Sequence, residues 1–476
     1  MTMTGCRRAL ASRPPRSARP RTAPIWKNDA STMSQRYSEA PGARGHARYR
    51  GGVNGTVRSR DGSRRHPAIF VAVALGLMSS ACAGSLTASP ALPEAEPQRA
   101  SQEPIDDTFQ FPDVTGAPLE LTEVDSVSPA GEIVESWTLE EQVASLFMVH
   151  VPDATLSFHS GVYTDYPVAG FLLLGDNITG DVGESRGFVS SLRTLGDPEL
   201  LIAVDQEGGA VERLSPDEFP PAPELGEGNL DDTLTVAQER NGLVYEVGAN
   251  VNLGVVADVS PGEDAYIHNR SYGTDSSLVR DHVEAALAGS IQGVAVTVKH
   301  FPGHGITTDD THETVASTDI AFDEWRDVHG APFRIATDQQ VPMLMFGHLV
   351  VESVDAEPAS LSSAWVDLVR DEWGYEGVIV TDDLSMLEDS DDDRYADHTA
   401  NTVRALQAGA DLIIDSGGLT LGQTEERLAD AIAAVVEAVN DGSLASERIT
   451  ESATRLVELR LSLGGVVRPL EDAQSG

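Results

Sequence analysis

Short apolar runs recur between residues 134 and 465, and longer amphipathic stretches separate them. Each run is rich in Val, Ile, Leu, Phe or Met, which is the composition of buried strands. The eight runs are 146–149, 170–174, 200–204, 251–256, 294–298, 342–346, 377–380 and 410–414. Strands that alternate with helices predict parallel βα units, and a body of about 330 residues suits one α/β (β/α)8 TIM-type barrel. A doubly wound open sheet is the alternative.

Several helix boundaries are also readable. Residues 135–141 have the pattern of a capped helix start, and 277–291 and 424–439 have helical length. The last predicted helix runs from Ser446 to Leu463 and stops at Gly464, because glycine is a common helix terminator.

The first 66 residues differ from the rest in charge. They hold 15 Lys+Arg and 3 Asp+Glu, whereas the other 410 hold 18 Lys+Arg and 72 Asp+Glu. Residues 1–66 are rich in Arg, Pro, Gly and Ser without apolar periodicity, so we interpret them as a disordered basic extension. A start codon assigned too early, with Met33 as an alternative start, explains them equally well. The acidic remainder argues against nucleic acid as a partner, because its charge repels phosphates.

Residues 67–82 have the pattern of an export signal. Arg64 and Arg65 precede an apolar run at 68–78, which is too short to cross a bilayer and leads through small residues to Cys82. This ending resembles the lipobox of bacterial lipoproteins, whose cysteine is acylated, although Ser79 stands where Leu is usual. We therefore expect an extracytoplasmic protein that contacts the membrane only through a lipid on Cys82. A secreted protein and a cytoplasmic one are the alternatives.

Residues 83–133 are acidic and carry seven prolines, which is typical of a stiff, solvated linker. The predicted organisation is thus a basic extension (1–66), a signal peptide (67–82), a linker (83–133), a barrel (134–465) and a C-terminal tail (466–476). We expect a monomer.

Polar residues follow five of the predicted strands. They are Asp205 and Glu207, then Asp258, then Lys299 and His300, then His348, and finally Asp382 and Asp383. Because all strand ends of a barrel lie on one rim, where active sites are found, these side chains are expected around one pocket.

The chemistry of these residues suits glycoside hydrolysis. Asp382 would leave a buried strand as a carboxylate on the rim. In the glycine-rich loop at 301–312, Asp310 is close enough to His312 to hydrogen-bond the imidazole and make it a workable acid/base. A carboxylate nucleophile with a separate proton carrier is what a retaining glycosidase requires, although the acid is usually a second carboxyl group. Phosphate-loop, serine-elbow and HExxH motifs are missing from the sequence.

Four motifs resemble glycoside hydrolase family 3, and more narrowly its single-domain bacterial β-N-acetylglucosaminidases. They are KHFPGHG (299–305) followed by DTH (310–312), DQEGG (205–209) with Arg213, NRSYG (269–273), and TDDLSM (381–386). The resemblance implies that Asp382 is the nucleophile, that His312 is the acid/base oriented by Asp310, and that no cofactor or metal is needed. It also implies a set of residues that bind the terminal sugar: Asp205, Arg213, Arg270, Lys299 and His300.

Other residues near these motifs are expected to be structural, namely Glu207, His304, His348 and Asp383. The sequence departs from the usual family residues at Ala210, Ile306, Thr311 and the pair 387–388, and an acidic run follows at 389–393. The departures leave the core chemistry in place and bear on the side of the pocket that receives the leaving group. We interpret the acidic run as a solvated loop, with a calcium site as the alternative.

The predicted function is exo-acting removal of terminal GlcNAc from muropeptides or chitin-type oligosaccharides, with retention of configuration. A carbohydrate is thus the expected partner. The alternatives are a phosphorylase that uses phosphate in place of water, a β-glucosidase of the same family, and a sugar-binding lipoprotein without catalysis.

Overall fold

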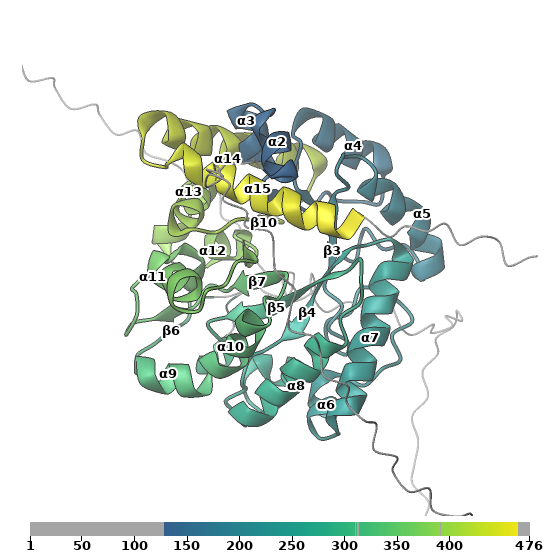
Figure 1. Ribbon diagram of the computed structural model, residues 1–476, viewed down its shortest axis with the longest axis vertical. Helices are drawn as coiled ribbons and strands as arrows, with labels where there is room; N and C mark the ends of the chain where they lie inside the picture. Colours follow the sequence, from purple (N-terminus) through teal and green to yellow (C-terminus); the bar gives the residue numbers. More distant parts are fainter. Residues whose placement is uncertain (1–127, 310, 312–313, 391, 465–476) are drawn as a thin grey trace, which may run out of the picture. The chain divides into compact units, whose positions relative to one another are not determined.

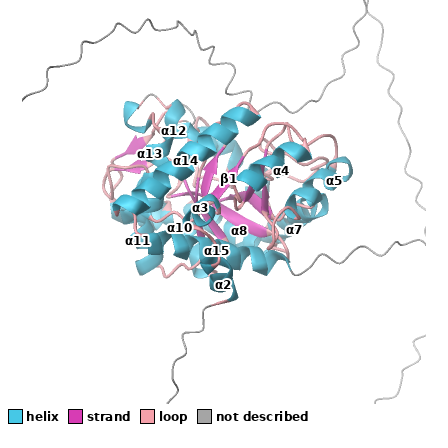
Figure 2. Cartoon of the chain, turned by 90° about the horizontal axis from the view of Figure 1, so that it is seen from above, coloured by secondary structure: helices cyan, strands magenta, loops and turns pink. Residues whose placement is uncertain are grey.

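The structure, a computed structural model, describes residues 128–464 apart from 310, 312–313 and 391. Eight parallel strands form one sheet in the order β10-β1-β2-β3-β4-β5-β7-β9. Helices surround these strands (Figures 1 and 2). The barrel strands are β1 (Phe147–Val149), β2 (Gly170–Leu173), β3 (Leu201–Val204), β4 (Val251–Val256), β5 (Ala295–Phe301), β7 (Met343–Phe346), β9 (Val378–Thr381) and β10 (Ile413–Asp415).

Helices α2 and α3 precede β1, and the other helices follow strands. The helices are α2 (Pro129–Glu135), α3 (Leu139–Ala144), α4 (Leu156–Asp165), α5 (Val182–Arg193), α6 (Ala222–Gly226), α7 (Leu230–Val247), α8 (Ser276–Ala288), α9 (Phe322–Val328), α10 (Gly330–Asp338), α11 (Ser363–Asp367), α12 (Ser385–Asp389), α13 (His398–Ala408), α14 (Leu421–Asp441) and α15 (Ser446–Leu463). Short 3-10 turns include η1 (Tyr266–Arg270) and η2 (His304–Ile306). A small parallel pair, β6 (Ser317–Thr318) and β8 (Val350–Val351), lies outside the barrel sheet.

The sheet closes between its two end strands, β9 and β10. A parallel bridge joins Val380 to Leu412, and the Thr381 N–H donates to the Leu412 carbonyl at 3.0 Å. This closure confirms the predicted barrel and excludes the open doubly wound sheet. All eight predicted strands are present, and every barrel-strand residue of β1, β2 and β3 is buried, as expected for strands covered by helices on the outside.

The structure differs from the prediction at two places. Strand β5 continues to Phe301 because Lys299 still pairs with Val256 of β4 and Phe301 with Phe346 of β7. Lys299 and His300 therefore lie within the strand, not after it. Residues 129–133, assigned above to the linker, are helical in α2, which is capped by Ser128 and buries Val134 against the body.

Helix α15 runs from Ser446 to Leu463, as predicted, and contacts α2, α3 and β9. Arg460 of α15 donates to the carbonyls of Pro198 and Glu199, which precede β3, so this helix lies at the amino-terminal end of the strands. The loops that follow the strands lie at the other, carboxyl-terminal end of the barrel.

Candidate active site

A pocket lies at the carboxyl ends of the strands and gathers six predicted site residues. These are Asp205, Arg213, Arg270, Lys299, His300 and Asp382. Apolar side chains from four strands line it as well, namely Leu172, Leu253, Met345 and Ile414. A pocket with an apolar wall and a few convergent polar groups is the usual form of a small-molecule site.

Asp382 follows β9 directly and is half-buried at the pocket wall. Its backbone N–H donates to the Phe346 carbonyl of β7 at 2.8 Å, and its Oδ1 accepts from the Asp383 N–H at 2.9 Å. The backbone of Asp382 is thus an extension of the strand ladder, which holds the carboxylate on a rigid element.

Asp383 has a different role from Asp382, because its carboxylate supports the loop. Its Oδ1 accepts from the N–H groups of Ser385 and Ser416, each at 3.0 Å, and its Oδ2 accepts from the Ser416 hydroxyl. Burial, followed by the nearby Asp415, raises the pKa of Asp383. His348 lies behind it: Nδ1 is 2.8 Å from the Ser360 hydroxyl and Nε2 is 2.9 Å from the Asp383 carbonyl oxygen. These contacts tie the ends of β7, β9 and β10 together.

Two cations and two carboxylates form a buried ion network beside the pocket. Glu207 accepts both arms of the Arg270 guanidinium, at 2.8 and 2.7 Å, and its Oε1 lies 2.6 Å from the Lys299 Nζ. Lys299 also contacts Asp205 Oδ1 at 2.8 Å. We define these four residues, Asp205, Glu207, Arg270 and Lys299, as the upper network.

Charge pairing outweighs burial in the upper network. Burial alone would raise the pKa of Glu207, but Arg270 and Lys299 hold that pKa well below its usual range. Burial would likewise lower the pKa of Arg270 and of Lys299, yet their carboxylate partners raise both pKa values. All three groups are therefore charged at neutral pH.

His300 is oriented by a buried carboxylate, Asp258, at the end of β4. The His300 Nδ1 lies 2.7 Å from Asp258 Oδ2, and its Nε2 lies 3.1 Å from Arg270 Nη2. Because a guanidinium can only donate, this geometry fits the tautomer with its proton on Nδ1 and a bare Nε2. Burial would raise the pKa of Asp258, but His300 and the further contacts lower it below the ordinary value.

The loop after β5 returns to the pocket through Thr311. Its Oγ1 lies 2.9 Å from His304 Nε2, and both residues line the pocket together with Tyr266. Asp310 and His312, the predicted acid/base pair, lie outside the described residues, as does Cys82.

The loop after β3 presents Arg213 by a tight hairpin. Gly208 and Gly209 adopt positive φ values of 87° and 66°, which favour glycine. The Gln206 side chain accepts from the N–H groups of Arg213 and Leu214, at 3.0 and 2.8 Å. The backbone of Arg213 is therefore anchored beside the pocket.

Comparison with known proteins gives this site a family. The model named "Glycosyl hydrolase family 3 N terminal domain" matches residues 138–459. The chain belongs to glycoside hydrolase family 3. A β-hexosaminidase of Nitrosomonas eutropha is 30% identical over 279 residues, which cover 56% of this chain and 79% of that protein. The β-hexosaminidase LpqI of Mycobacterium tuberculosis is 30% identical over 337 residues, covering 67% and 82%.

A solved structure agrees with this family 3 assignment. The family 3 β-N-acetylglucosaminidase of a Paenibacillus species superposes with a TM-score of 0.64 at 30% identity. The match covers 71% of this chain and 65% of that one, so this chain spans slightly less than two thirds of the Paenibacillus protein.

The departures from the usual family 3 residues have local explanations. Ala210 is exposed on the β3 loop, and Ile306 packs against an apolar cluster of the barrel wall. Glu388 pairs with Arg427 at 2.5 Å, and Arg427 also pairs with Asp415 at 2.9 Å, so the extra carboxylate has a partner.

The acidic run after α12 is partly paired. Asp389 is exposed, and Asp392 pairs with Arg394 at 2.6 Å. Within 128–464, outside the four masked positions, the acidic and His side chains form no group that could hold a metal ion. In the same part of the chain, no helix has the length and apolar character needed to cross a membrane.

Three residues in or beside the pocket have contacts that the sequence did not indicate. Asp258 was noted only as a strand-end carboxylate, yet it orients His300 and His304. Tyr266 was not noted, although it lines the pocket. Glu207 was expected to be structural, and it pairs with both Arg270 and Lys299. Asp258 and Glu207 had a signal, since both follow predicted strands, whereas Tyr266 had none.

Proposed function

We propose that this protein is a retaining exo-β-N-acetylglucosaminidase that hydrolyses a terminal, non-reducing GlcNAc. The observation that carries the proposal is the placement of Asp382 in one pocket with the Lys299–Asp205 pair, Arg270 and His300. A carboxylate that could attack C1 thus faces a ring of hydrogen-bonding groups suited to sugar hydroxyls. The names of the β-hexosaminidase and β-N-acetylglucosaminidase relatives support the choice of an N-acetylated sugar.

In the proposed first step, a carboxylate oxygen of Asp382 attacks the anomeric carbon and the bond to the leaving oxygen breaks. His312 gives a proton to that oxygen, with Asp310 orienting the imidazole. In the second step His312 takes a proton from water, the water attacks the anomeric carbon, and the bond to Asp382 breaks. Two displacements at one carbon retain its configuration.

The upper network would bind the sugar and would take no part in bond making or breaking. The Lys299–Asp205 pair and the Arg270–Glu207 pair offer cationic donors and anionic acceptors whose positions are set before the substrate enters. Such preorganisation avoids the cost of ordering these side chains during binding. Arg213 and His300 would add contacts to the hydroxyls and the acetamido group.

The sequence patterns and the family resemblance support a proposal for the natural substrate and the location. We propose muropeptides or chitin-type oligosaccharides as substrates, for an exported protein acylated at Cys82. Metabolic labelling with a radioactive fatty acid in a bacterial host tests the anchor. The wild type should be labelled and Cys82→Ala should not, and label on both would contradict this part of the proposal.

The activity test uses the full chain with an aryl N-acetyl-β-glucosaminide and an aryl β-glucoside. We expect turnover of the N-acetyl substrate, and a loss of several orders of magnitude in kcat for Asp382→Asn, because a covalent nucleophile is removed. Asp338→Asn, a matched change at an exposed helical position, should keep full activity.

Two further arms separate the alternatives. Inorganic phosphate added to the assay would produce GlcNAc-1-phosphate if the enzyme were a phosphorylase. Preference for the glucoside would indicate a β-glucosidase. A folded wild type that binds GlcNAc but turns over neither substrate would overturn the hydrolase proposal.

A further inference from the structure

His304 is buried against the machinery of the pocket, but it has no role in the proposed chemistry. Its side chain packs against Tyr266, with ring centroids 5.6 Å apart, and lies edge-on to His300 at 5.9 Å. Its backbone N–H donates to Asp258 Oδ1 at 2.6 Å, so the carboxylate that orients His300 also fixes His304.

The backbone on both sides of His304 is equally constrained. Gly303 has a φ of 122°, a conformation that side-chain-bearing residues rarely adopt. A Cβ on Gly305 would lie 1.8 Å from the Val259 carbonyl oxygen, so only glycine fits there. The backbone that carries His304 is therefore rigid, and it fixes the direction in which the His304 side chain extends.

That direction leads to Thr311. The His304 Nε2 and the Thr311 Oγ1 are 2.9 Å apart, and the two residues are 3% and 4% exposed. In the chain, Thr311 stands between Asp310 and His312, the residues proposed as the acid/base pair. One peptide bond joins Thr311 to each of them, so Thr311 is the described residue nearest to the pair along the chain.

His304 itself is a poor candidate for proton transfer. Burial, followed by repulsion from His300, lowers the pKa of His304 to about 4, so the imidazole is neutral at neutral pH. Its Nδ1 is buried and has no hydrogen-bond partner among the residues that the structure describes. A buried nitrogen without a partner costs stability, and an apolar side chain would avoid that cost. The polar contact that the ring does make is the one to Thr311.

We propose that His304 is a positioning residue that places the acid/base pair by holding Thr311. The inference rests on the proposed function. In this proposal, efficient proton transfer to the leaving group depends on the buried His304–Thr311 contact. The nucleophile and sugar binding do not depend on it. Loss of the contact should therefore lower kcat/KM, which reports the first displacement, only for substrates whose leaving oxygen needs a proton.

The test compares two substrates on the full chain. N,N′-diacetylchitobiose has a sugar hydroxyl as leaving group, which needs a proton, whereas 2,4-dinitrophenyl N-acetyl-β-glucosaminide has a leaving group that needs none. Thr311→Val keeps the shape and removes the hydroxyl. We expect kcat/KM for chitobiose to fall about 10- to 100-fold, since misplacing a general acid has that order of effect. For the dinitrophenyl substrate kcat/KM should stay within about threefold, and KM for chitobiose should change little.

Conservative and matched variants accompany this test. Thr311→Ser keeps the hydroxyl and should restore most of the chitobiose activity. Thr308→Val makes the same substitution at an exposed position of the same loop and should leave both activities unchanged. His304→Leu should resemble Thr311→Val, and the double variant should lose no more than the worse single one, because both act through one contact.

The outcomes separate this inference from the function on which it rests. Unchanged chitobiose turnover in Thr311→Val, or an equal loss on both substrates, overturns the positioning role while the hydrolase proposal stands. If His304→Leu does not fold, the Thr311 variants still decide. A wild type that hydrolyses neither substrate overturns the hydrolase proposal and this inference with it.

Discussion

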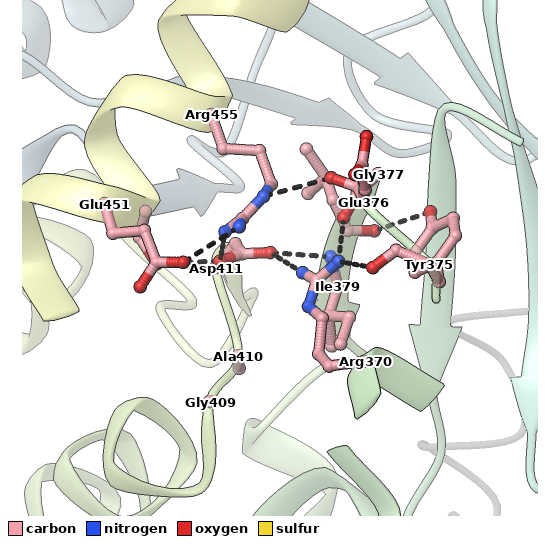
Figure 3. Close-up of polar contacts among 12 residues, drawn as sticks. Arg370, Tyr375, Glu376, Gly377, Ile379, Gly409, Ala410, Asp411, Glu451 and Arg455 are labelled. Carbon is pink, nitrogen blue, oxygen red and sulfur yellow. Dashed lines mark hydrogen bonds and ion pairs between the residues drawn. The ribbon is translucent and has the colours of Figure 1, made fainter. Parts of the chain in front are cut away.

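The barrel carries a buried ion network at each end, and the two are built differently. At the amino-terminal end, Asp411 just before β10 is fully buried and pairs with Arg370, Arg448 and Arg455, at 2.6, 2.5 and 2.6 Å. We call these four residues the lower network. Figure 3 shows Asp411 between Arg370 and Arg455, with Glu451 beside Arg455.

The lower network also donates to backbone carbonyls. Arg370 donates to the carbonyls of Tyr375 and Gly377, at 2.7 Å each, and Arg455 to the Glu376 carbonyl at 3.1 Å (Figure 3). Asp411 Oδ2 also accepts from the Ile379 N–H of β9 at 2.9 Å. The network thus joins α15 to the β9–β10 seam, where the barrel closes through a single bridge instead of a full ladder.

The upper network, with two carboxylates and two cations, lies at the opposite end of the strands. Asp205, Arg270 and Lys299 line the pocket, so their polar atoms stand beside space that a ligand can enter. A buried network whose donors are consumed by backbone carbonyls stabilises the fold, whereas one that borders a cavity can bind. Both networks contain buried carboxylates, and they differ in position relative to the strand ends and in the ratio of carboxylates to cations.

The largest expected effect is on stability, from Asp411→Asn. The change keeps the side-chain shape but removes the buried carboxylate that three guanidinium groups share, so that Arg370 loses its carboxylate while Arg448 and Arg455 keep Glu451. Removing one partner from a buried pair costs about 3–5 kcal/mol. We expect the free energy of unfolding, measured with denaturant, to fall by that amount while kcat/KM of the folded protein is unchanged. Asp338→Asn is the matched control, and lost activity without lost stability would break the comparison.

Two Arg→Lys variants, one in each network, test which network affects catalysis. Arg270→Lys keeps the charge but loses the two-armed contact with Glu207, so we expect kcat/KM to fall about 10- to 100-fold, or roughly 1.4–2.7 kcal/mol. Arg448→Lys makes the same change in the lower network and should leave kcat/KM unaltered. Similar kinetic losses in both variants would show that the division between binding and structural networks is wrong.

The stabilisation by the lower network should depend on pH in the acid range. Burial would raise the pKa of Asp411, but Arg370, Arg455 and Arg448 lower it below 3.8. A depressed folded-state pKa contributes stability above the unfolded pKa, and this contribution is lost as pH falls through the folded value. The stability difference between the wild type and Asp411→Asn should therefore shrink as pH falls from about 5 toward 3. Denaturant titrations at several pH values measure it, and a difference that grows in acid would contradict the pairing.

Much of the barrel was predictable because each strand is a local pattern. The apolar runs indicated all eight strands, and the polar residues after them indicated the rim. Strand ends were less accurate: Lys299 and His300 belong to β5 because they pair with neighbouring strands, and no local pattern reveals such pairing. The motifs led to Asp382 and to the side chains proposed to bind the sugar through family resemblance.

The two networks depend on contacts between distant parts of the chain. Glu207 meets Arg270 and Lys299 only after three separate βα units have folded side by side. Asp411 is a lone carboxylate in an apolar run, and its partners lie in α15 and in the segment before β9. One sequence shows neither the distance between such residues nor which cation a carboxylate will choose.

The smallest expected effect concerns a third cluster, at the carboxyl ends of the strands but less buried. Glu388 and Asp415 share Arg427, with side chains 19%, 9% and 18% exposed. Glu388→Gln leaves Arg427 paired with Asp415, so no charge is stranded and the cost should stay within about 1 kcal/mol. Turnover of an aryl N-acetyl-β-glucosaminide should stay within about twofold. A loss of more than about 2 kcal/mol in the free energy of unfolding would show that this cluster is structural, like the lower network. A loss of activity on chitobiose alone would show that the cluster lies where the leaving sugar binds. Because Glu388 replaces a small family residue, that second result would also give the substitution a role in substrate choice.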